Sequence, residues 1–91
     1  MYLEIVNPEA SLVSGNVESV TVPGINGEFQ MLNDHAAIVS VLDAGKVKFK
    51  GNPTISEDFQ DRFVKEGDIW TLQINGGTVE CNNNRVIILA D

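Results

Sequence analysis

The feature of this chain that most constrains its fold is a series of short β-type runs separated by turn residues. In most runs apolar residues alternate with polar ones, and each run is only a few residues long. The separators contain Pro, Gly, Asn or Asp and recur about every 8–12 residues, a spacing typical of an all-β sandwich or barrel. We therefore expect an all-β fold, a flattened β-sandwich or barrel of about ten short, mostly antiparallel strands.

The expected core positions recur at every second residue of these runs. One face of successive runs carries Leu3 and Ile5; Val20 and Val22; Phe29 and Met31; Val47 and Phe49; Trp70, Leu72 and Ile74; Val79 and Cys81; and the closing run 86–89. The run 36–42 is largely apolar, which predicts burial on both of its faces. For Trp70, a core anchor is the favoured interpretation and an aromatic residue on a binding face is the alternative.

Two tight-turn signals lie close together between the second and third expected strands. Pro23-Gly24 suits the centre of a type II turn, and Asn26-Gly27 suits a type I′ hairpin turn. We therefore expect the backbone to reverse twice within a few residues. That would project Glu28 at the end of a sheet, where a partner could contact it.

The segment 54–67 fits two conformations. Thr54 and Glu57 match a helix capping box, Phe59 and Phe63 are four residues apart, and Gly67 suits a helix C-terminus. The same residues also alternate as a strand would, and their neighbours are all β-type. We favour an extended hairpin arm, because so short a helix is marginal by itself.

Length and charge restrict the class of protein. The 91 residues suit one domain, 1–91, and 13 acidic against 6 basic residues give a net charge of −7. Such a surface repels nucleic acid and anionic lipid. The longest apolar run, 86–90, is far below the roughly 20 residues of a membrane span. We expect neither a nucleic-acid partner, nor direct membrane insertion, nor a secretory signal.

The only basic cluster is Lys46, Lys48 and Lys50. These lysines alternate with Val47 and Phe49, so the favoured interpretation is the solvent face of one strand. A phosphate-binding patch is the alternative.

The sequence offers little material for catalysis or metal binding. Asp34-His35 is the only pair that suggests acid–base chemistry, and no serine motif accompanies it. The single Cys81 lies in phase with Val79 and is expected to be a small buried hydrophobic residue. One His and one Cys, far apart, do not make a zinc site, and the acidic residues of 57–66 lack the glycine of a calcium loop. We expect no catalytic residue, no metal and no cofactor.

Together, these motifs resemble the epsilon subunit of the bacterial F-type ATP synthase, specifically its N-terminal β-sandwich domain. The most specific match is Val20-Thr-Val-Pro-Gly-Ile-Asn-Gly-Glu28, against a family signature Val-x-x-Pro-Gly-x-x-Gly-Glu. Further matches in the same order are the segments 3–9, 14–18, 35–40, 45–47, 75–80 and 86–91. The likeness covers almost the whole chain.

The resemblance implies a non-catalytic rotor subunit of the central stalk. Such a subunit links the γ subunit to the membrane c-ring and couples proton-driven rotation to ATP synthesis, at the cytoplasmic face of the bacterial inner membrane. By the same resemblance, Gly27, Glu28 and Phe29 would contact the c-ring. Asn7, His35 and Ser40 would face the γ subunit.

The chain departs from the family pattern in three places. Asn33-Asp34 replace a Pro-Gly before His35, and Ala37 replaces a proline after it; residues 50–66 resemble an insertion. The chain also ends at Asp91, where family members usually continue into two helices, so we expect no inhibitory or ATP-sensing arm. Two other functions compete with the rotor subunit: a free-standing β-sandwich adaptor that binds a protein or glycan through Trp70 or the turns, and a small hydrolase using His35.

Overall fold

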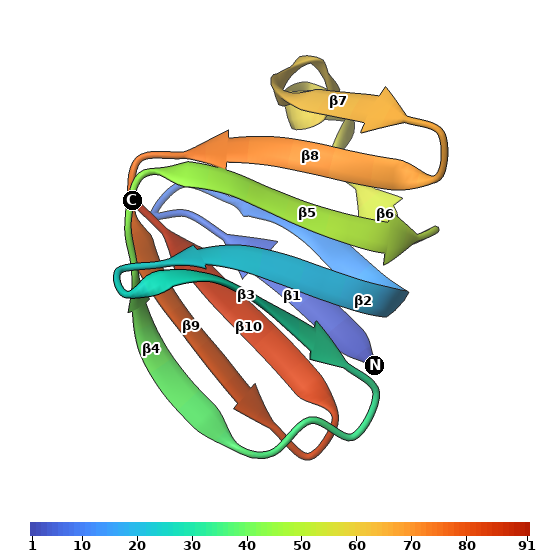
Figure 1. Cartoon of the computed structure of the whole chain (residues 1–91). Helices are drawn as coiled ribbons and strands as arrows, with labels where there is room; N and C mark the ends of the chain where they lie inside the picture. The colour runs from blue at the N-terminus through green and yellow to red at the C-terminus, as the bar shows by residue number, and fades with distance from the viewer.

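Strands form wherever the sequence alternates apolar and polar residues, and the fold is all-β as predicted. The computed structural model describes residues 1–91 and contains ten strands and one short 3-10 helix (Figure 1). The elements are β1 (Tyr2–Val6), β2 (Ser11–Gly24), β3 (Gly27–Leu32), β4 (Ile38–Leu42), β5 (Gly45–Gly51), β6 (Thr54–Ile55), η1 (Glu57–Arg62), β7 (Phe63–Glu66), β8 (Ile69–Ile74), β9 (Gly77–Asn82) and β10 (Arg85–Ala90).

The long strand β2 joins the two parts of the sheet. Its first half pairs with β1 and β6, and its second half pairs with β3 and β5. On one side of β2 the hydrogen-bonded order is β1, β10, β9, β4, and on the other side it is β5, β8, β7 (Figure 1). Every pairing is antiparallel except β1 with β10. The 14 residues of β2 therefore belong to both layers of the fold.

Most residues that the alternation marked are buried, but Phe29 and Trp70 are only half-buried, and the core also contains residues that it did not mark, among them Leu12, Val13 and Ile55. The core contains 21 buried hydrophobic residues and no buried polar or charged side chain. Val20, Val22, Met31 and Val79 are fully buried. Trp70 is half-buried and packs edge-on against the buried Phe63, with ring centroids 6.4 Å apart. Trp70 lies at the edge of the core and packs against it, which fits the interpretation of Trp70 as a core anchor.

The prediction of two reversals between residues 23 and 27 is wrong. Pro23 and Gly24 end β2 and pair with Glu28 and Gly27, so the hairpin has one two-residue turn, Ile25-Asn26. Pro23 is tolerated in β2 because the ladder to β5 ends at Thr21, and its missing N–H is not needed there. Gly24 is required for space: an added Cβ would lie 2.8 Å from a ring carbon of Phe29.

The segment 54–67 contains both of the conformations that the sequence left open. Glu57–Arg62 is the 3-10 helix η1, preceded by Ser56, which makes no side-chain cap. Phe63–Glu66 then forms β7, which pairs with β8 through a turn at Gly67 (φ +63°). The hairpin arm is confirmed for β7, and the extended conformation is wrong for η1.

The prediction that 36–42 is buried on both faces is also wrong. Ala36 and Ala37 lie outside any strand, and in β4 only Leu42 is buried. Val39 and Val41 point away from the core, on the face of β4 opposite Leu42. The sheet of β1, β10, β9 and β4 therefore has an outer face with exposed aliphatic side chains.

Candidate functional site: an apolar docking face

Cross-strand pairing brings aliphatic side chains from three strands into one row. Val41 of β4 lies opposite Thr78 of β9, Thr78 lies opposite Leu89 of β10, and Leu89 lies opposite Val6 of β1. Side chains of directly paired residues on one face of a sheet are neighbours. We call this row together with Val39 the β4 face.

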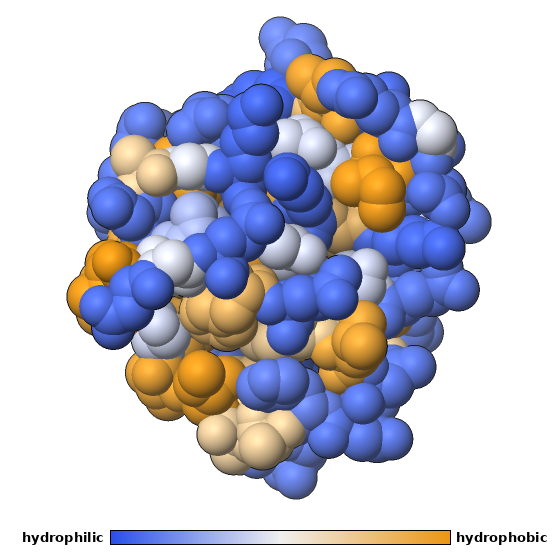
Figure 2. All heavy atoms as spheres, viewed as in Figure 1, coloured by the Kyte–Doolittle hydropathy of each residue, from blue (hydrophilic) through white to orange (hydrophobic).

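The β4 face has a large exposed aliphatic surface. Val39 is 75% exposed, Val41 is 53% exposed and Leu89 is 52% exposed. Figure 2 shows apolar residues gathered over β4 and the β2–β3 turn, while hydrophilic residues cover most of the rest of that view. A contiguous exposed apolar patch with polar surroundings marks a protein contact surface.

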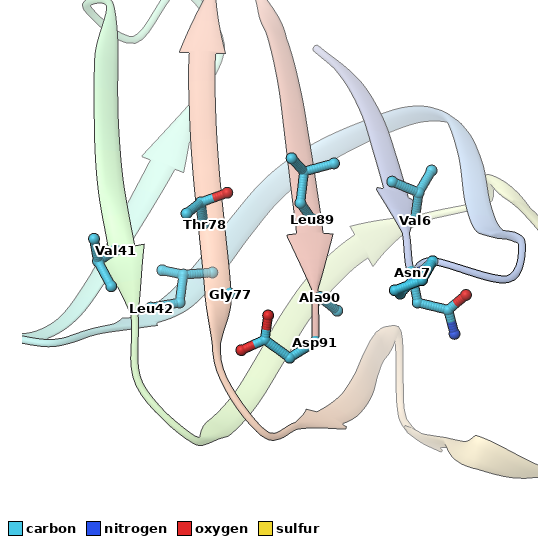
Figure 3. A pocket seen from close by; sticks show the side chains of 10 residues that line it. Val6, Asn7, Val41, Leu42, Gly77, Thr78, Leu89, Ala90 and Asp91 are labelled. Atoms are coloured by element: carbon cyan, nitrogen blue, oxygen red, sulfur yellow. The ribbon is translucent and has the colours of Figure 1, made fainter.

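A pocket of about 500 Å³ adjoins the row where β1, β4 and β10 end and β9 begins (Figure 3). Its lining is half hydrophobic and comes from Val6, Asn7, Pro8, Val41, Leu42, Gly77, Thr78, Leu89, Ala90 and Asp91. Figure 3 shows the Asp91 carboxylate between β9 and β10, at the end of the sheet. The β4 face thus ends in a hollow that can take an apolar side chain of a partner and offers an acidic group beside it.

Asn7, a predicted γ contact, is one of the residues that line this pocket. Its Oδ1 accepts hydrogen bonds from the backbone N–H groups of Glu9 (2.9 Å) and Ala10 (2.8 Å). These bonds form a local Asn turn that holds the side chain in place. The Asn7 amide group is left at the rim of the pocket, where it can donate to a partner.

The other two predicted γ contacts lie in β4 and in the loop that precedes it. Ser40 is in the middle of β4, half-buried on the side of Ile38 and Leu42, and its hydroxyl donates to the Val41 carbonyl at 3.3 Å. His35 lies in the β3–β4 loop, where its Nδ1 is 2.7 Å from the Ala36 carbonyl oxygen. The structure does not bring the three residues together: only Asn7 lines the pocket, Ser40 lies on the face of β4 opposite Val39 and Val41, and His35 precedes the strand.

The predicted c-ring residues occupy the β2–β3 hairpin. Gly27 and Glu28 are exposed, whereas Phe29 is half-buried and packs against the core on the other face of β3. Lys48 of β5 forms an ion pair with Glu28 at 3.7 Å, with the Glu28 side chain 56% exposed. Gly27 and Glu28 are therefore accessible to a partner, and Phe29 supports the hairpin from behind.

The histidine, cysteine and carboxylate side chains do not gather into a metal site. No group of three His, Cys, Asp or Glu side chains is arranged to hold a metal ion. Cys81 is buried, and burial raises the pKa of its thiol. The one helix, the six-residue η1, is too short to span a membrane. What the surface offers a partner is aliphatic area, a hollow and an exposed hairpin.

Sequence reasoning missed Val39 and Val41 as surface residues. Their run lacks polar residues at alternate positions, so the pattern could not separate an outward face from an inward one. The resemblance marked Ser40 of the same strand as a contact, but Ser40 lies on the other face of β4 and gives no signal for the two valines.

Comparison with known families gives a match over the whole chain. Residues 1–91 match the family described as "ATP synthase, Delta/Epsilon chain, beta-sandwich domain". An ATP synthase epsilon chain from Chlorobaculum tepidum is 36% identical over 89 residues, which cover 98% of this chain and 86% of that relative. One from Campylobacter curvus is 37% identical over 91 residues, all of this chain but only 60% of the relative.

Solved structures share the fold at lower sequence identity. A chain of the Tetrahymena thermophila mitochondrial ATP synthase, in a structure of the central stalk and c-ring, matches 99% of this chain with a TM-score of 0.74 and 16% identity. A chain of the Euglena gracilis mitochondrial ATP synthase matches 97% with a TM-score of 0.73 and 21% identity. This chain spans 62% and 48% of those two chains.

Proposed function

Because the chain belongs to the β-sandwich family of the ATP synthase delta/epsilon chain, we propose that it is a non-catalytic rotor subunit. It links the γ subunit to the c-ring, and it couples proton-driven rotation to ATP synthesis at catalytic sites elsewhere in the complex. The observation that carries this proposal is the coincidence of a whole-chain family match with an exposed apolar face beside the expected γ contacts.

The γ subunit docks on the β4 face in this proposal. Val39, Val41 and Leu89 supply apolar area, and burial of such area stabilises a complex by roughly 25 cal/mol for each Å² removed from water. Asn7, which lines the pocket at one end of the β4 face, and His35, in the loop before β4, add polar contacts that fix the orientation. Ser40 points to the opposite face of β4, away from this contact. A strong grip is needed here, because the contact must transmit torque.

The c-ring contact is the β2–β3 hairpin in this proposal. Exposed Glu28 faces a basic loop of the ring, while Phe29 fixes the hairpin to the core. Charges at such a rim mainly set orientation and association rate. The subunit then lies at the cytoplasmic face of the bacterial inner membrane as a peripheral part of the complex.

A direct test is capture of the γ subunit by the isolated chain. Val41→Lys places a charge in the middle of the apolar row, and we expect it to weaken capture about tenfold or more. Val64→Lys is the matched control, because Val64 is similarly exposed (57%) but lies on β7. Equal capture of the γ subunit by both variants would show that γ does not bind the β4 face. If no ATP synthase subunit were captured at all, the free-standing adaptor would replace the rotor subunit.

A further inference from the structure

A second hollow lies on the outer side of β5, β8 and β7, and the proposed rotor function does not use it. Its volume is about 580 Å³. The lining residues are Lys46, Lys48, Arg62, Val64, Glu66, Ile69, Thr71 and Gln73. Its two lysines belong to the basic cluster of the sequence, and both point outward, since Val47 between them and Phe49 after Lys48 are buried.

Strand pairing orders these side chains across the hollow. Lys46 lies opposite Gln73, and Lys48 lies opposite Thr71, which in turn lies opposite Val64. Arg62 directly precedes β7, whose first residue, Phe63, pairs with Leu72 beside Gln73. Lys46 and Arg62 thus lie at one end of the hollow with the Gln73 amide, and Lys48 lies in the middle of it with the Thr71 hydroxyl. Ile69 and Glu66, which are paired with each other, occupy the other end.

The charge of the hollow is opposite to that of the chain. Three cations and one carboxylate give it a net charge of +2, in a molecule of net charge −7. Lys48 forms an ion pair with Glu28 at 3.7 Å, outside the lining of the hollow, whereas Lys46 and Arg62 form no ion pair. The Arg62 guanidinium lies over the Phe59 ring, 5.8 Å from the ring centroid. Lys50, next on the same strand, pairs with Asp68 at 3.2 Å and Glu18 at 3.9 Å, which raises its pKa.

We propose that this hollow binds a phosphate ester, with the phosphoryl group between Lys46, Lys48 and Arg62. A guanidinium group holds two phosphate oxygens at once, and ammonium, hydroxyl and amide groups supply further donors. Glu66 at the far end disfavours a second anionic group, so the ligand carries one anionic group and a neutral remainder. The volume lies within the range of about 300–1,000 Å³ for small-molecule sites.

Titration of the ¹⁵N-labelled chain with glycerol 3-phosphate tests the proposal. We expect saturable amide shifts confined to the hollow. We expect Lys46→Gln and Arg62→Gln each to weaken binding about three- to tenfold, since each removes a charge-assisted hydrogen bond at a partly exposed site. Lys65→Gln is the matched control: it removes the same charge from β7, but its ammonium lies over the Trp70 ring, 5.1 Å from the ring centroid, and not in the hollow.

A second arm identifies the source of the phosphate. Vesicles of phosphatidylcholine with and without phosphatidylglycerol are assayed by co-sedimentation with the same variants. Binding of glycerol 3-phosphate alone identifies a soluble phosphate ester, and binding of phosphatidylglycerol vesicles alone identifies a lipid headgroup. The absence of both, or an equal loss in Lys65→Gln, would overturn the proposal. γ capture is measured separately on the β4 face, so either result can fail without the other.

Discussion

At the scale of single residues, glycines at the turns serve different physical needs. Gly67 adopts φ +63°, and an added Cβ would meet nothing within 4 Å, so its requirement is conformational. Gly24 has no positive φ and is required for close contact with Phe29. Gly77 combines the two needs, because it has φ +150° and an added Cβ would lie 2.1 Å from the Leu89 carbonyl oxygen.

Gly77→Ala is therefore expected to be strongly destabilising. The Cβ would collide with the backbone of β10, which cannot move without breaking its ladder with β9. We expect a loss of about 2–4 kcal/mol in the free energy of unfolding, measured by denaturant titration. Gly67→Asn is the control and should cost less than about 1 kcal/mol, because Asn tolerates the left-handed region in open space. Equal costs for the two variants would contradict this account.

Cys81 links stability to alkaline pH. Burial favours the neutral thiol, so its pKa is raised in the folded chain, while the unfolded chain keeps an ordinary thiol pKa. Above that ordinary value the unfolded state binds fewer protons than the native state, and the free energy of unfolding falls by up to about 1.4 kcal/mol per pH unit. Denaturant titrations between pH 7.5 and about pH 10 measure this slope.

The matched variant for this measurement is Cys81→Ala. Without the thiol, its free energy of unfolding should fall less steeply as the pH rises. The ion pairs that raise the Lys50 pKa act in the same direction but only at higher pH, when the lysine itself loses its proton. An identical pH dependence of the two proteins would show that the thiol titrates normally in the fold.

At the scale of elements, the β7 arm depends on one side chain. Phe63 is the only buried residue of β7, and its ring packs edge-on against Phe49 (6.2 Å between centroids) and Trp70 (6.4 Å). Phe63→Ala removes both contacts, and we expect amide exchange in β7 to accelerate far more than in β1 and β10. Exposed Val64→Ala should leave the exchange pattern unchanged. Uniform acceleration in every strand would mean that the arm does not open as a separate unit.

The sequence predicted those elements in which periodicity and burial agree. Val20, Val22 and Met31 alternate with polar residues, and all three are fully buried. Prediction failed where the local signal had two solutions. Pro23-Gly24 is a strong turn signal, but pairing with Glu28 and Gly27 keeps it in β2, which only the tertiary structure could decide.

The candidate site was only partly predictable for the same reason. Glu28 is exposed in the hairpin and Asn7 lines a pocket, but their contacts with partners stay predictions. The exposure of Val41 could not be predicted, because it depends on which face of β4 the second layer covers. The hollow at Lys46 also required the fold, since it is Arg62, distant in sequence, that completes it.

At the scale of the whole molecule, one small body presents two adjoining surfaces to the partners proposed for it. The end of β4 is bonded to the β2–β3 hairpin, since the Val41 carbonyl accepts a hydrogen bond from the Ile25 N–H at 3.2 Å. The longest dimension of the molecule is 31 Å, and all its buried hydrophobic residues belong to a single cluster. Because packed interiors have low compressibility, a force applied at the β4 face is transmitted to the β2–β3 hairpin with little deformation. A rotor link of this kind fails when either surface loses its partner, even if the fold is intact.

Glu28→Lys tests that consequence in the assembled synthase. The substitution reverses the exposed charge of the hairpin and places it beside Lys48, so a basic loop of the c-ring would be repelled. We expect proton-driven ATP synthesis in membrane vesicles to fall about two- to tenfold. ATP hydrolysis by the detached catalytic part should be unchanged, since no catalytic group is altered. Glu57→Lys in η1 makes the same charge change on another exposed surface and should leave synthesis intact. Normal synthesis in Glu28→Lys would show that the ring is contacted elsewhere.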